Sequence, residues 1–320
     1  MSPRRRACIA IASACLFALP TAHAVDKPVR LVVSIAAGGA TDVVVRTIGI
    51  GMAKTLGTTV IVDNKPGGNG TVAAAAVATA RQDEITMLFI PSSIVQNASL
   101  RTDIPNYLPK LTPVGLAAVI PVALVVSPDL GPKNLKEFIA LAKSKPGTLS
   151  FASPGSGSSS HILGEVLARE TGIKLIHVPY KGEAQSVPDV FGGRLSSAFG
   201  AVGSLEKYEA NGKKLVLLAV TGAQRLRSVP NIPTFEEQGV PNMTMLGWMG
   251  TFVANSTPKE TVNKLAEALK LAVATPEVQS VCTRVGFECR ATSPEEFSAH
   301  LDKELKAWPE LVKGLDISFQ

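Results

Sequence analysis

The stretch SIAAGGATD, residues 34–42, joins a short valine-rich run to a longer apolar run. Residues 29–33 have the length and composition of a buried strand, and residues 43–56 have the length of a helix. A turn at this junction presents backbone N–H groups at the positive end of the helix dipole, where anions bind. Glycine suits such a turn because it accepts positive φ and allows close backbone approach. The stretch is therefore a candidate anion-binding turn at the end of a strand.

A second turn of the same kind, SPGSGSSSH at residues 153–161, lies between apolar runs at 149–151 and 162–168. It adds several serine hydroxyls to the exposed amides of a helix start. Two such turns far apart in the sequence predict a cleft with one turn on each wall. The first turn lacks the G-x-G-x-x-G spacing of a dinucleotide fingerprint, and no phosphate-loop lysine occurs.

Short β-rich runs alternate with helical runs along the chain, which predicts an α/β protein with mostly parallel sheets covered on both faces. The pattern changes at a long apolar run, 116–127, which Pro121 interrupts, and a second α/β series begins there. Three helical segments from residue 258 onward cannot form a domain alone and are expected to pack on the first sheet. The chain is therefore expected to cross twice between two lobes, near 118–125 and near 220–227.

The predicted domains are lobe 1, residues 25–120 with 226–320, and lobe 2, residues 121–225. Two crossing segments between two lobes have the geometry of a hinge. Ligands of open α/β sheets bind beyond the carboxyl ends of the strands, which is where both glycine-rich turns lie. We therefore expect the ligand to bind between the lobes.

Residues 1–24 are typical of a cleaved secretory signal peptide. Three arginines at positions 4–6 precede an apolar stretch, 7–19, and Ala22-His23-Ala24 matches an A-x-A cleavage site. The apolar stretch is too short to span a bilayer comfortably, so we expect a soluble exported protein. Removal of this segment leaves 29 basic and 26 acidic residues. That balance, without a basic stripe interleaved with aromatics, argues against nucleic acid and is compatible with a small anionic ligand.

Cleavage also removes two of the four cysteines and leaves Cys282 and Cys289. An even pair in an exported protein suggests a disulfide, and two buried free thiols are the alternative. A zinc site is not expected, because no nearby histidine or further cysteine completes four ligands. Nothing in the sequence calls for a metal or another cofactor.

Several residues near the turns have both a structural and a functional interpretation. Asp42 or Thr41 can cap the helix that follows the first turn, and either can also contact a ligand. Ser156 or Ser159 with His161 invites comparison with a hydrolase, but no G-x-S-x-G elbow is present. Residues adjacent in sequence also rarely provide nucleophile–base geometry. We therefore expect no enzyme activity, with a serine hydrolase as a minor alternative.

These segments together resemble the periplasmic substrate-binding receptors of tripartite tricarboxylate transporters, the Bug-type family. The resemblance covers essentially the whole mature chain and depends on many short matches in one order. They are PVRLVV (28–33), GG and TDV (38–39 and 41–43), VDNKPG (62–67), FAS with GSG and His161 (151–157 and 161), HVPYKG (177–182), LAVT (218–221), Arg225, VPNIPT (229–234) and TPKE (257–260).

The resemblance implies a type II periplasmic-binding-protein fold whose two lobes close on a small carboxylate. It implies that main-chain amides and hydroxyls of the two turns hold the carboxylate, often through bridging waters. The ligand-binding residues expected from the resemblance and from the sheet edge are Ala37, Gly38, Gly39, Thr41, Asp42, Ser92, Ser93, Ser153, Ser156, Ser159 and His161.

The sequence departs from the family pattern at three places. Ala36 and Ala37 stand where the family often has prolines, and Asp83-Glu84 replaces the usual Asp-Gly. The run 198–201 is Ala-Phe-Gly-Ala, where a small polar or acidic residue is common. These departures leave the identity of the carboxylate open and favour a less polar distal end.

The sequence thus predicts a monomeric receptor that captures a small carboxylate and delivers it to membrane transporter subunits. Closure would follow from contacts that only the closed form allows. The alternative is an exported sensor subunit that uses the same fold to signal to a membrane partner.

Overall fold

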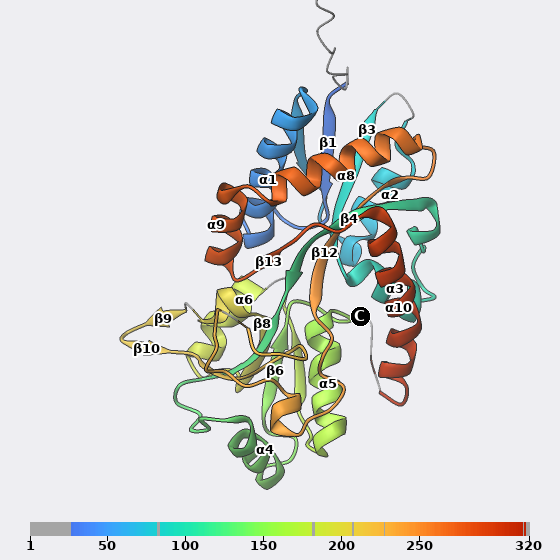
Figure 1. Cartoon of the computed structure of the whole chain (residues 1–320). Helices are drawn as coiled ribbons and strands as arrows, with labels where there is room; N and C mark the ends of the chain where they lie inside the picture. Colours follow the sequence, from blue (N-terminus) through green and yellow to red (C-terminus); the bar gives the residue numbers. More distant parts are fainter. Residues whose placement is uncertain are drawn as a thin grey trace, which may run out of the picture.

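The computed structural model describes residues 27–81, 84–180, 183–206, 208–226, 228–315 and 317. The predicted signal peptide, 1–24, and the departure at Asp83 lie outside these residues. The described chain builds two separate main sheets, one in each half of the molecule (Figure 1). Their helices and strands alternate as the sequence predicts, so the α/β class is confirmed. The expectation of mostly parallel sheets is wrong, because antiparallel strand pairs are at least as common as parallel ones in each sheet.

The first sheet has six strands in the order β13-β4-β12-β3-β1-β2. Strands β1, β2 and β3 are parallel, whereas β12 is antiparallel to both of its neighbours. The central strands are apolar on both faces, as expected for a sheet covered by helices on both sides. The bounds are β1 Val29–Val33, β2 Val60–Asn64, β3 Ile85–Pro91, β4 Leu111–Ile120, β12 Gly247–Ala254 and β13 Glu288–Cys289.

Helices cover both faces of this sheet. One core is shared by α1, α8 and α9, and the other face packs against α2, α3 and α10. The C-terminal helices therefore return to the first sheet, as the sequence analysis expects (Figure 1). The bounds are α1 Ala40–Leu56, α2 Thr71–Ala78, α3 Ser93–Leu100, α8 Lys259–Val273, α9 Pro276–Val285 and α10 Pro294–Val312. Helix α3 is an element that the sequence analysis did not assign.

The second sheet has five strands in the order β11-β5-β8-β6-β7. Strand β6 is parallel to β7 and β8, and β5 is antiparallel to β8 and β11. The bounds are β5 Val122–Val126, β6 Ser150–Ser153, β7 Ile176–Pro179, β8 Ser197–Ala201 and β11 Val216–Val220, with helices α4 Leu135–Ser144, α5 Ser159–Thr171, α6 Glu183–Phe191 and α7 Val202–Glu206. A short pair, β9 Glu209–Ala210 and β10 Lys213–Lys214, forms a separate hairpin.

The chain passes directly from the first sheet to the second at Pro121, which alone separates β4 from β5. Residues beyond the predicted return passage, 220–227, still contact the second sheet. Phe235 stacks on Phe199 of β8, and Thr234 pairs with Val220. The segment around Phe235 therefore packs on the second sheet, although the predicted domain boundary at residue 226 assigns it to lobe 1.

Two glycines bring the halves of the molecule into backbone contact. A Cβ added to Gly203 in α7 would lie 2.2 Å from the Cα of Gly286, at the end of α9. Only glycine at both positions allows this approach. Gly286 lies in the short segment between Cys282 and Cys289, which a disulfide joins in the structure. The disulfide therefore encloses the residue through which α9 touches the second half.

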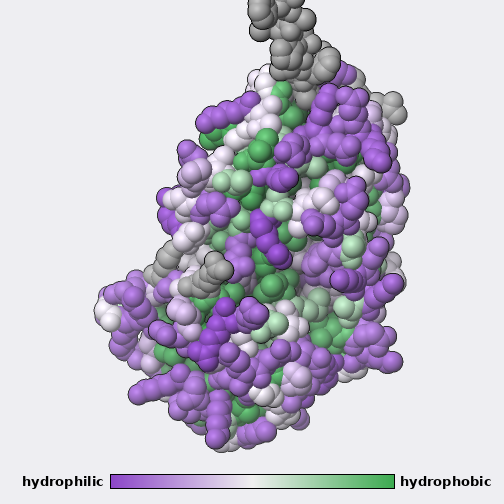
Figure 2. Space-filling model, viewed as in Figure 1, coloured by the Kyte–Doolittle hydropathy of each residue, from purple (hydrophilic) through white to green (hydrophobic). Residues whose placement is uncertain are grey.

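Hydrophilic residues cover most of the face shown in Figure 2, with hydrophobic residues visible down its middle. Among the described residues, no helix is both long enough and apolar enough to cross a membrane.

We predict that Gly164→Ala destabilises the second sheet by roughly 1–3 kcal/mol, the usual cost of overpacking a core. A Cβ at Gly164 in α5 would lie 2.1 Å from a ring carbon of the buried Phe151. Urea unfolding of the purified protein measures the loss.

The matched control is Gly49→Ala, also inside a helix. Its added Cβ would lie 3.3 Å from a Leu31 methyl group, and alanine favours helix. We expect a change below about 1 kcal/mol there. Equal stability of the Gly164→Ala variant and the wild-type protein would contradict the packing described for α5.

Candidate functional site

The first glycine-rich turn is organised by the carboxylate of Asp42. Helix α1 begins at Ala40 with Gly39 as its N-cap, so neither Thr41 nor Asp42 caps it. Asp42 lies in the first turn and accepts hydrogen bonds from Gly38 N–H, Arg46 Nε and Asn64 Nδ2, each 2.9 Å long. The capping prediction is therefore wrong in detail, because the carboxylate reaches back to the turn instead of standing at the N-cap.

This arrangement changes what the turn offers to an anion. Burial pushes the pKa of Asp42 upward, but hydrogen bonds from Arg46, Gly38 and Asn64 outweigh burial and lower that pKa. The buried carboxylate is therefore ionised and already accepts the Gly38 amide proton. Ala37, Gly38 and Gly39 are exposed and Thr41 is half-buried. In this conformation the Gly38 N–H donates to Asp42 and is not available to a ligand.

Side chains from the two halves meet directly at Ser159, the first residue of α5. Its Oγ lies 3.1 Å from Ser92 Oγ and 2.6 Å from Gln96 Nε2. Ser92 is the N-cap of α3, and Gln96 follows one helical turn later. The structure thus brings together Ser92 and Ser159, two of the predicted site residues, which lie at helix starts in different halves of the molecule.

Gln96 is a residue that sequence analysis missed. It is 1% exposed, and its Oε1 has no hydrogen-bond partner among the described residues. The available signal was the i, i+4 spacing from Ser92, which has meaning only if residues 93–100 form a helix. Without that helix assignment, the sequence did not indicate that the Gln96 side chain lies beside Ser92.

The second turn holds its own histidine. Ser158 is the N-cap of α5 and accepts the His161 N–H at 3.3 Å. The Gly157 N–H donates to His161 Nδ1 at 3.0 Å, and the His161 ring stacks on that of His177 with centroids 3.6 Å apart. The buried His161 ring therefore stabilises the turn by accepting one of its backbone N–H groups.

No nucleophile–base pair forms among the serines proposed for hydrolysis. Ser159 bonds to Ser92 and Gln96, whereas His161 Nδ1 accepts a backbone amide. The close serine–histidine pair is instead Ser153 Oγ with His177 Nε2, 2.7 Å apart. Ser153 is 1% exposed, so a substrate cannot reach its hydroxyl without rearrangement. Ser156 is half-buried in the turn, and Ser93 is buried at the start of α3.

Both stacked histidines are neutral over most of the physiological pH range. Burial, with a smaller contribution from the charge of His177, lowers the pKa of His161 to about 4. Burial alone lowers the pKa of His177 to about 4. The wall around the second turn therefore offers amides and hydroxyls rather than positive charge.

Glu183, at the start of α6, is a second residue that sequence analysis missed. Its Oε2 accepts the Ala201 N–H at 2.8 Å, and its Oε1 is buried without a partner among the described residues. Burial raises the pKa of Glu183 to about 7, although bonds from Ala201 and Ser204 oppose the rise. Val202, the residue after Ala201, donates its backbone N–H to the carbonyl oxygen of Pro121. Glu183 therefore titrates beside the first passage between the sheets.

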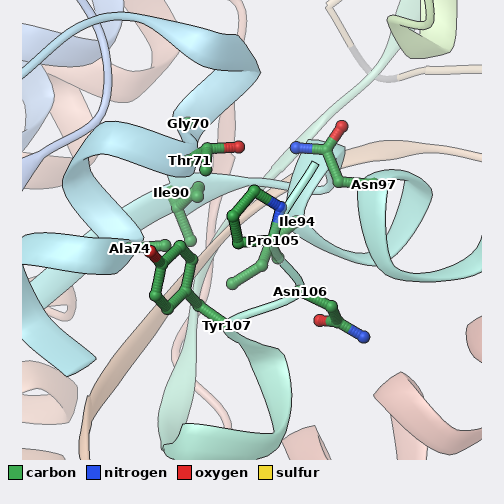
Figure 3. Close-up of a pocket in the computed structure, with 9 residues that line it drawn as sticks. All are labelled: Gly70, Thr71, Ala74, Ile90, Ile94, Asn97, Pro105, Asn106 and Tyr107. Atoms are coloured by element: carbon green, nitrogen blue, oxygen red, sulfur yellow. The ribbon is translucent and has the colours of Figure 1, made fainter. Parts of the chain in front are cut away.

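A small pocket inside the first half is separate from these groups (Figure 3). It lies between α2, α3 and the loop that carries Tyr107, and its volume is about 10 Å³. That is room for about one water molecule, so it cannot hold an organic ligand. Among the described residues, no cluster of histidine, cysteine or carboxylate side chains is suited to a metal ion.

Comparison with known proteins gives the fold and the site a family. The model of the "tripartite tricarboxylate transporter family receptor" matches residues 44–317. The UPF0065 protein of the tcbD–tcbE intergenic region of Pseudomonas sp. (strain P51) is 31% identical over 315 residues, which cover 97% of this chain and 94% of that protein.

Two solved structures share the whole architecture. The periplasmic binding protein BugD is 31% identical, with a TM-score of 0.81 over 92% of this chain and 99% of that chain. MatC from Rhodopseudomonas palustris, solved with bound malate, is 28% identical, with a TM-score of 0.79 over 90% of this chain and 99% of that chain.

The fold and these matches define a periplasmic solute-binding receptor and not an enzyme. The chain belongs to the tripartite tricarboxylate transporter receptor family. The predicted periplasmic-binding-protein fold and the family resemblance are thereby confirmed. The family also places the protein in the periplasm.

We predict that the buried histidines make the protein less stable in acid. The pKa of His161 falls from 6.5 to about 4 on folding, so the unfolded chain binds more protons between these pH values. The free energy of unfolding therefore decreases as pH falls from 6.5 to 4. In His161→Asn, the Asn Oδ1 can still accept the Gly157 N–H, and we expect a shallower loss in urea unfolding. Ser144→Ala, at an exposed residue without a titratable side chain, is the control and should keep the wild-type slope.

We predict the opposite slope for Glu183. Its pKa rises from 4.5 to about 7 on folding, so its stabilisation is full below pH 4.5 and is lost as pH rises through 7. Glu183→Gln should remove up to about 2–3 kcal/mol of this pH dependence. Unfolding curves at several pH values measure it, with the exposed Glu277→Gln as control. Parallel pH profiles for Glu183→Gln and wild type would refute the burial of this carboxyl group.

Proposed function

We propose that this receptor captures a small carboxylate between its two halves and delivers it to membrane transporter subunits. The observation that carries the proposal is the meeting of Ser92, Gln96 and Ser159 at the start of α5. Neutral donors from both halves converge there at the positive end of a helix of 13 residues. Such donors bind a carboxylate without the cost of desolvating a second charge.

The bound malate of MatC supports the choice of a carboxylate over other anions. In this chain, the Ala-Phe-Gly-Ala run that ends β8 is mostly buried and supplies no polar side chain, which favours a ligand with a less polar distal end. The remaining ligand-binding residues are proposed to be Ala37, Gly38, Gly39, Thr41, Asp42, Ser93, Ser153, Ser156 and His161, with Asp42, Ser153 and His161 acting as supports of the turns.

Closure is proposed to occur by rotation about two passages between the lobes. Pro121 forms the first passage, and the packing of Phe235 supports a second passage near residues 244–246 instead of 226. The contacts of Ser159 with Ser92 and Gln96 join side chains from both sheets, so they belong to the closed form. The receptor is proposed to act as a monomer, exported by the signal peptide at residues 1–24.

We predict that Ser159→Ala and Gln96→Ala each weaken carboxylate binding at least tenfold. A hydrogen bond to a charged group contributes about 1.5–3 kcal/mol, and each 1.4 kcal/mol is a factor of ten. The measurement is ligand-dependent thermal stabilisation of the mature protein across aliphatic and aromatic carboxylates, followed by calorimetry with the best ligand.

The matched control is Ser144→Ala, which removes an exposed hydroxyl on α4 and should bind like wild type. Stabilisation by no carboxylate, with the fold intact, would count against the proposed function. Undiminished binding by the Ser159→Ala and Gln96→Ala variants would leave a carboxylate receptor but move its site elsewhere.

A further inference from the structure

A second, larger pocket lies under α10, beside the return passage between the sheets. Its volume is about 280 Å³, enough for an organic molecule. The pocket is formed by β4, the segment that leads into β12, the residue after β13 and one face of α10. Its lining residues are Leu116, Val119, Thr244, Met245, Leu246, Trp248, Arg290, His300, Lys303, Glu304 and Ala307. None of them belongs to the two glycine-rich turns or to the Ser92–Ser159 contact.

The inner wall of this pocket is apolar. Leu116, Val119 and the ring of Trp248 are buried, and Met245 and Leu246 extend the surface toward the second sheet. The indole N–H of Trp248 is also buried and has no acceptor among the described residues. A buried donor of this kind in a pocket wall is one that a ligand oxygen can satisfy after a small movement.

Two cationic side chains lie at the opening of this pocket, which we call its rim. Arg290 and Lys303 line the pocket and are exposed. Within the described part of the chain, neither has an ion pair with a carboxylate. Opposite charges favour an anionic occupant, and unpaired cations beside an apolar wall are available to it.

The remaining charged group of the pocket is Glu304, which opposes an anion. It is 8% exposed, and its two oxygens face His300 Nε2 and Trp308 Nε1, each at 3.3 Å. Its charge is thus directed toward partners on its own helix. The two rim cations outnumber it, so the pocket as a whole favours negative charge.

The pocket borders the return passage and reaches the proposed carboxylate site through Trp248, whose carbonyl accepts the Ser92 N–H at 3.0 Å. Thr244, Met245 and Leu246 come from the segment that returns from the second sheet to the first. Leu246 also lies close to Gly222, which follows β11 of the second sheet, since a Cβ added to Gly222 would lie 3.3 Å from a Leu246 methyl group. An occupant would therefore contact the chain where it passes between the sheets.

We propose that this pocket is a binding site for a small organic anion with an apolar body. The apolar body lies against Trp248 and its aliphatic neighbours, and the anionic group lies between Arg290 and Lys303. This site shares no lining residue with the proposed carboxylate site, and its occupancy does not require the proposed function to hold.

Anilinonaphthalene sulfonate, an aromatic anion that fluoresces in apolar surroundings, is the probe that tests the site. We expect saturable fluorescence with the folded wild-type protein, accompanied by quenching of tryptophan emission. The two tryptophans of the chain are Trp248 in the wall and Trp308 beside Glu304. Lys303→Glu should weaken binding at least tenfold, and Ala307→Phe should fill the pocket and abolish saturation.

The matched control is Lys306→Glu, which makes the same charge change on the same helix at an exposed residue outside the pocket. It should bind the probe within about twofold of wild type, since a screened surface charge contributes little. Ser159→Ala should also bind normally. Probe fluorescence that does not saturate, that falls equally with Lys303→Glu and Lys306→Glu, or that falls with Ser159→Ala instead, would overturn the proposal.

Discussion

The arrangement of the two halves depends on the shorter of the two connections between their sheets, which is the single residue Pro121. Strand β4 ends at Ile120 and β5 begins at Val122, so Pro121 leaves almost no free chain between them. The Val202 N–H donates to the Pro121 carbonyl, which ties the end of β8 to the same point. So short a connection keeps the adjoining ends of the two sheets next to each other. The meeting of Ser159 with Ser92 and Gln96, and of Gly203 with Gly286, follows from that limit.

The groups around the two turns share an electrostatic pattern. Asp42 is ionised but surrounded by its own donors, and His161 and His177 are neutral because burial lowers the pKa of each. What remains at the junction are hydroxyls, amides and a helix N-terminus. A receptor must release its solute as well as bind it, and neutral donors hold a carboxylate less tightly than a buried arginine does. The pattern is therefore suited to reversible capture.

The pocket under α10 has the contrasting pattern, with an apolar wall and cations at its rim. Its wall includes residues of the return passage, and Glu183 titrates beside the other passage through Pro121. Each of the two connections between the halves is thus bordered by its own group of residues, the pocket at one and a buried carboxyl group at the other.

The sequence by itself determined the alternation of strands and helices, the two glycine-rich turns and the family, because these depend on local patterns and on many matches in one order. It also suggested the disulfide between Cys282 and Cys289, which the structure contains. It did not find Gln96 or Glu183, since no sequence motif indicates which residues the side chains of this glutamine and this glutamate contact. Tertiary structure alone decided that the Gly38 amide belongs to Asp42, that Ser153 pairs with His177, and that Phe235 packs on the second sheet. The physical reason is that these contacts join residues whose distance is set by how helices and sheets pack, which local sequence does not encode.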